Sequence, residues 1–128
     1  MELPREWLER ARVFLKDASR HLREGVYWLS CFDSHQAVEF YLKAFSIALT
    51  GMYPFSHDLV ELLGFLEDAG VKVPKKLYVY ADALTPHYTL SRYPGRKHLK
   101  YSKELAKRCL KYAKKIIEWV EKEASKKS

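Results

Sequence analysis

The fold is decided by residues 27–50, whose sequence is YWLSCFDSHQAVEFYLKAFSIALT. Wound as an α-helix, this stretch carries apolar side chains on almost every side, and Gly51 follows it as a helix stop. A helix that is apolar all round is buried by its neighbours. We therefore expect this helix at the centre of a helical bundle.

Further helices are predicted on both sides of this central segment. Apolar positions recur at helical spacing, between Pro, Ser and Gly boundary residues, at about residues 4–24, 56–70, 74–85 and 99–124. Residues 87–97 are expected to be irregular because Pro94-Gly95 interrupts any periodic structure. The alternation typical of strands is missing from the sequence. The prediction is an all-α fold, an up-and-down helical bundle of about five helices that forms one domain over residues 1–128.

Composition narrows the class of protein. The chain has 128 residues, of which 48% are hydrophobic, without a run of 18 apolar residues or a secretion signal at its start. We expect a cytoplasmic protein that does not associate with membranes. Cys31 and Cys109 are interpreted as two buried thiols, with a disulfide between them as the alternative. Because the sequence lacks zinc-ligand spacing, we expect no metal site and no cofactor.

Positive charge is concentrated at one end of the chain. Residues 92–128 hold 13 Lys and Arg against 4 Asp and Glu, a balance of +9, whereas residues 1–91 have a balance of −2. The lysines of the last predicted helix repeat at three- and four-residue steps, so they share a face. Such a face suits a polyanion, although it also serves simply as a solvated surface.

Polar residues interrupt the apolar central helix along one narrow stripe. Gln36, Glu39, Lys43 and Ser46 are spaced 3, 4 and 3 residues apart. One interpretation is a Glu39–Lys43 ion pair at the surface. The other is that the stripe lines a cleft and meets residues from the loop after the fourth predicted helix, since unpaired buried charge is costly.

Histidines near helix boundaries have simpler interpretations. Ser56 is predicted to cap the third helix, with His57 and Asp58 in its first turn. His57 has no partner at a suitable sequence spacing, and we interpret it as structural. The isolated His21, His35 and His87 are interpreted in the same way.

The loop from Arg92 to His98 is the best candidate for a functional site. An arginine can stabilise charge on a phosphate and a histidine can transfer protons, while Tyr88 and Tyr93 can stack on unpaired bases. The same residue types would also suit an ordinary basic surface loop. The predicted catalytic residues are Arg92 and His98, and Gln36, Glu39, Lys43 and Tyr93 support them. The cations expected to contact phosphates are Arg96, Lys97, Lys100, Lys103 and Lys107.

Three motifs resemble the HEPN domain family. Residues 31–44, CFDSHQAVEFYLKA, are similar to the Gln, Glu and Lys pattern on the family's central helix. Residues 56–63, SHDLVELL, resemble its Ser-His-x-Leu start of the third helix. Arg92-Tyr93-Pro94 resembles the Arg-Tyr-Pro of small archaeal and bacterial members.

This resemblance implies two alternative functions. Ribonuclease members are metal-independent endoribonucleases of toxin–antitoxin systems, whose Arg and His motifs meet across a homodimer, and Arg92 and His98 match their spacing. Other members are non-catalytic partners of a minimal nucleotidyltransferase, which serves as the antitoxin where the HEPN protein is a toxin. We expect RNA or nucleotide binding, with RNA cleavage as its most specific form. A binding partner and a purely structural dimer are the alternatives.

Overall fold

The computed structural model describes residues 1–94 and 100–127 of the chain. These residues form helices joined by short loops and contain no strand, so the predicted all-α bundle is confirmed. The helices are α1 (Arg5–Arg23), α2 (Tyr27–Thr50), α3 (Leu59–Asp68), α4 (Lys75–Leu84), α5 (His87–Leu90) and α6 (Lys103–Lys126).

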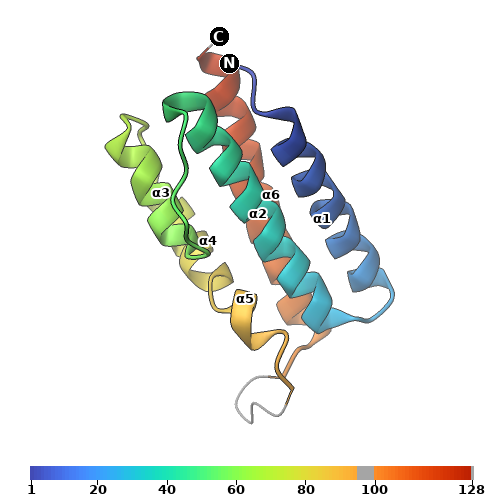
Figure 1. Cartoon of the computed structure of the whole chain (residues 1–128). Helices are drawn as coiled ribbons and strands as arrows, with labels where there is room; N and C mark the ends of the chain where they lie inside the picture. Colours follow the sequence, from blue (N-terminus) through green and yellow to red (C-terminus); the bar gives the residue numbers. More distant parts are fainter. Residues whose placement is uncertain (95–99, 128) are drawn as a thin grey trace.

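The central position predicted for α2 is confirmed. It packs mainly on α1 and α6 and also contacts α3, α4 and α5, so it runs through the middle of the bundle (Figure 1). Val38, Leu42 and Phe45 are completely buried on it. Gly51 ends the helix with a φ of 80°, a left-handed conformation that glycine adopts without a steric penalty.

The segment predicted to be irregular contains a short helix. Pro86 has a φ of −60°, which suits the start of a helix, and the single turn α5 follows it. The last helix begins at Lys103 rather than near residue 99, because the Ser102 side chain accepts a hydrogen bond from the Leu105 backbone N–H. α5 lies at the end of the bundle opposite the two chain termini (Figure 1).

The cap of α3 differs from the prediction. Asp58, rather than Ser56, precedes the first helical residue, and its carboxylate accepts hydrogen bonds from the backbone N–H groups of Val60 and Glu61. The Ser56 hydroxyl instead accepts a bond from the Asp58 N–H and donates one to Glu61. His57 therefore lies in the loop before the helix and not in its first turn.

Replacing Asp58 by alanine is expected to lower the free energy of unfolding by about 1 kcal/mol, because it removes the oxygen that caps α3. Asp58→Asn keeps a capping oxygen and is expected to retain most of the stability. Urea denaturation of both variants measures the difference. Equal stability of Asp58→Ala and the wild type would contradict the assigned cap.

The described residues contain no helix that is long and apolar enough to cross a bilayer.

Candidate functional site

The polar stripe of α2 is buried. Glu39 is 2% exposed and Lys43 is 6% exposed, and the Lys43 ammonium donates a hydrogen bond of 2.8 Å to the Glu39 carboxylate. The Tyr53 ring, in the loop between α2 and α3, lies 5.4 Å from the Lys43 ammonium. The interpretation of Glu39 and Lys43 as a surface ion pair is therefore wrong, because both side chains are buried. Their opposite charges compensate each other away from water.

His57 extends this buried pair to the protein surface. Its Nδ1–H donates to both oxygens of the Glu39 carboxylate, at 3.0 and 3.1 Å. Its side chain is nevertheless 51% exposed. Because Nδ1 is occupied by the carboxylate, Nε2 is the nitrogen available to a molecule outside the protein. A carboxylate that orients a half-exposed imidazole is an arrangement suited to proton transfer.

The backbone of His57 is held by a second histidine. The Nε2–H of the fully buried His35 donates to the His57 carbonyl at 2.8 Å. Burial lowers the pKa of His35, which favours the neutral form of this imidazole. The Gln36 side-chain amide lies 3.2 Å from its other ring nitrogen. His35 and Gln36 thus support the loop that carries His57, while Glu39 orients the His57 side chain.

Arg92 lies on an aromatic surface at the end of α5. Its guanidinium carbon is 4.6 Å from the Tyr88 ring centroid, 5.0 Å from that of Phe32 and 5.8 Å from that of Tyr93. Its Nε–H donates to the Tyr88 carbonyl at 2.8 Å, while the side chain remains exposed. Contact with the ring faces stabilises the cation, and its terminal N–H groups have no partner among the described contacts.

Tyr88 joins Arg92 to His57. The Tyr88 and His57 rings are stacked, with centroids 3.8 Å apart and planes inclined by 12°. An array therefore runs through Arg92, Tyr88, His57, Glu39 and Lys43, which we call the α2–α5 site. It presents a guanidinium and an imidazole at the surface above a buried ion pair, and the exposed Tyr93 ring lies beside the guanidinium. These groups can bind a phosphate, stack on a base and transfer a proton.

The structure brings together part of the predicted site. Arg92, Tyr93, Glu39 and Lys43 belong to the α2–α5 site or contact it, and Gln36 lies behind it. His98 lies outside the described residues, as do Arg96 and Lys97.

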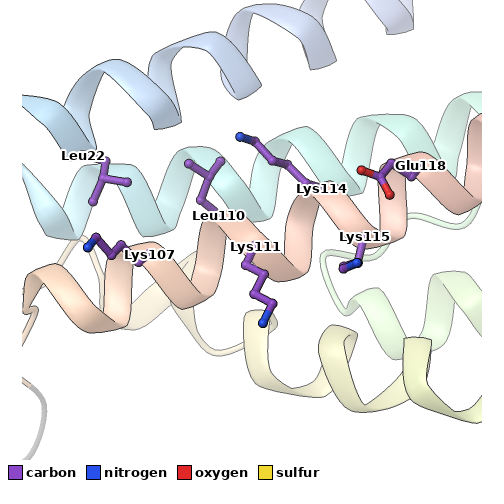
Figure 2. A pocket seen from close by; sticks show the side chains of 7 residues that line it. All are labelled: Leu22, Lys107, Leu110, Lys111, Lys114, Lys115 and Glu118. Carbon is purple, nitrogen blue, oxygen red and sulfur yellow. The ribbon is translucent and has the colours of Figure 1, made fainter.

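The predicted phosphate-binding lysines of α6 lie along a different surface. α6 packs on the side of α2 that carries Tyr41 and Phe45, rather than on the side of Glu39 and Lys43. Lys107 lines a shallow groove of about 320 Å³, together with Leu22, Leu110, Lys111, Lys114, Lys115 and Glu118. Figure 2 shows that the lysine side chains along this groove point in different directions. Lys100 and Lys103 are exposed near the start of α6, at the same end of the bundle as α5.

Sequence reasoning missed His57 as a member of the site. The contact between His57 and Glu39 joins the loop before α3 to the middle of α2, so no local spacing predicts it. The polar stripe of α2 was the one feature of the sequence that could have indicated this contact, because a buried carboxylate needs partners from other segments. The two thiols, by contrast, are as predicted, since Cys31 and Cys109 are both free and buried.

Comparison with known proteins assigns the family. The sequence model of the HEPN domain family matches residues 4–123, which is almost the whole chain. The chain belongs to the HEPN family. The three motifs described above lie on α2, across the start of α3 and after α5 of this HEPN fold.

Solved structures agree with this assignment. The protein TT1696 of Thermus thermophilus is 34% identical, with a TM-score of 0.84 and coverage of 92% of this chain and 95% of that one. An archaeal HEPN homologue is 26% identical, with a TM-score of 0.77 and coverage of 96% and 98%. A HEPN domain protein of Thermotoga maritima is 28% identical, with a TM-score of 0.77 and coverage of 94% and 98%. A search of curated proteins finds no match.

Proposed function

We propose that this HEPN protein binds single-stranded RNA or a nucleotide at the α2–α5 site. The observation that carries the proposal is the exposed Arg92 guanidinium held on the Tyr88 ring, which in turn stacks on the half-exposed His57. A guanidinium forms paired hydrogen bonds with phosphate oxygens, and the exposed Tyr93 ring beside Arg92 can stack on a base. The positive balance of residues 92–128 favours the approach of a polyanion.

The most specific form of this function is RNA cleavage without a metal ion. In this proposal one imidazole, of His57 or His98, removes the proton of a ribose 2′-hydroxyl, which then attacks the adjacent phosphorus. The other imidazole donates a proton to the departing 5′-oxygen, leaving a 2′,3′-cyclic phosphate and a 5′-hydroxyl. Arg92 stabilises the charge on the phosphate during the transfer. His57 supports this form because it combines exposure with a buried orienting carboxylate.

The RNA-binding proposal predicts a specific salt dependence. We expect Arg92→Ala to weaken binding of a single-stranded RNA oligonucleotide in EDTA and to reduce the slope of log K against log salt by about 0.7, the value for one phosphate contact. Arg92→Lys keeps the charge and is expected to keep the slope while binding less tightly. Fluorescence anisotropy at several salt concentrations measures both quantities.

Arg5→Ala is the matched control, because it removes one positive charge from an exposed i,i+4 pair at the far end of the bundle. It is expected to bind RNA as the wild type does. Equal slopes for Arg92→Ala and Arg5→Ala would contradict the assignment of Arg92 as a phosphate ligand. The failure of the wild type to bind RNA or a nucleotide at low salt would contradict the function.

A second candidate function is that of a non-catalytic partner of a minimal nucleotidyltransferase. The observation that favours it is apolar exposure in the loop beside the site, where Phe55 is 94% exposed and Met52 is 66% exposed. Exposed apolar residues of this size are typical of protein interfaces, either with such a partner or with a second copy in a homodimer. A neighbouring reading frame for a small nucleotidyltransferase, followed by co-purification of the two proteins, would support this alternative.

A further inference from the structure

A second cluster of reactive side chains lies inside the bundle and shares no residue with the α2–α5 site. It consists of Cys31 on α2, His87 on α5 and Cys109 on α6, all of them buried. One donor atom of each, the two sulfurs and a ring nitrogen, lies within 4.8 Å of the other two. Three helices thus converge on one point through two thiols and an imidazole.

The His87 ring is oriented by a neighbouring hydroxyl. Its Nδ1 lies 2.6 Å from the Tyr101 hydroxyl, in the segment that leads into α6. When Nδ1–H donates to this oxygen, the lone pair of the neutral ring is on Nε2. Histidines that bind metals usually have their second nitrogen fixed by a hydrogen bond of this kind.

The chemistry and spacing of the donors suit a thiophilic ion. Thiolate sulfur and imidazole nitrogen are the usual ligands of Zn²⁺, with Zn–S near 2.3 Å and Zn–N near 2.0 Å. A tetrahedral ion with these bond lengths places its donors about 3.5 to 3.8 Å apart. Small side-chain rotations would bring donors that are now within 4.8 Å to this separation.

We infer that Cys31, His87 and Cys109 form a binding site for Zn²⁺ or a similar thiophilic ion that joins α2, α5 and α6. A tetrahedral ion would take its fourth ligand from water, because the Tyr101 oxygen lies at the other nitrogen of the His87 ring. Because α5 also carries Tyr88 and is followed by Arg92, the ion would hold these residues against α2. The role is structural, and metal binding does not depend on whether the protein binds RNA.

Titration with Co²⁺ tests the site directly. The full-length protein, reduced and freed of metal, is expected to bind one Co²⁺ with a thiolate-to-cobalt charge-transfer band and visible bands typical of tetrahedral cobalt. Zn²⁺ is expected to displace the Co²⁺ and to raise the Tm. Wild-type protein that binds no Co²⁺, or that binds it without the thiolate band, would overturn the inference without recourse to any variant.

Variants identify the ligands. Cys31→Ser, Cys109→Ser and His87→Gln are each expected to weaken Zn²⁺ binding at least 100-fold, and Tyr101→Phe about 10-fold through loss of ring orientation. His21→Gln is the matched control, because it removes an imidazole that is paired with Asp33 elsewhere in the bundle. Circular dichroism establishes that each variant is folded. Unchanged Zn²⁺ affinity in a folded Cys31→Ser or Cys109→Ser variant would refute the assignment.

Discussion

Replacing Glu39 by alanine is expected to lower the free energy of unfolding by about 3 to 5 kcal/mol, because it leaves the buried Lys43 ammonium without a counter-charge. The same change removes the carboxylate that accepts the Nδ1–H of His57. Urea denaturation at neutral pH measures the loss.

The double variant Glu39→Met/Lys43→Met is the informative control. Two well-packed apolar side chains often replace a buried ion pair with little loss, so this variant is expected to be within about 1 kcal/mol of the wild type. A double variant as unstable as Glu39→Ala would mean that packing, rather than the uncompensated charge, causes the effect. Preserved stability of Glu39→Ala would show that Lys43 reaches water when its partner is removed.

In the RNA-cleavage form of the proposed function, three substitutions have large effects on the rate. Arg92→Ala, His98→Ala and His57→Ala are each expected to reduce kcat/KM for a single-stranded RNA at least about 100-fold, the usual effect of losing an oriented charge or a proton-transfer group. The assay contains EDTA and detects the 2′,3′-cyclic phosphate end. Cleavage by all three variants at the wild-type rate would end the enzymatic proposal.

Two comparisons separate catalysis from binding. Arg5→Ala controls for the loss of one positive charge and is expected to cleave at the wild-type rate. His57→Ala is expected to lower kcat more than it raises KM, because the imidazole would act in the reaction rather than in holding the RNA. Wild-type protein that binds RNA but does not cleave it would favour the binding function and exclude the nuclease.

Much of the fold was predictable because the helical signals are local. The apolar residues on almost all sides of residues 27–50 predicted the central position of α2, and Gly51 predicted where it ends; both predictions are confirmed. The cap of α3 was less predictable, because Ser56 and Asp58 are both good capping residues only two positions apart. In the folded chain the Ser56 hydroxyl accepts a hydrogen bond from the Asp58 N–H, and the Asp58 carboxylate caps the helix.

The site was only partly predictable, because its contacts join distant segments. The spacing of Glu39 and Lys43 on one helix predicted that they would meet, and Arg92 was selected for its chemistry and its loop. His57 was interpreted as structural because its partner Glu39 lies on α2, and no local spacing in the sequence indicates a contact between the two. No metal site was expected at Cys31, His87 and Cys109, because these residues are far apart in the sequence. The fold nevertheless places their donor atoms together.

The amino-acid sequence by itself determined that this protein is a helical bundle around residues 27–50, since helix formation depends on neighbours a few residues apart. Only the tertiary structure decided that Glu39 orients His57, that Tyr88 stacks between His57 and Arg92, and that two thiols meet His87. The physical reason is that packing α2 against its neighbours sets these contacts. Burial then leaves each charged or polar group in need of a partner from another segment.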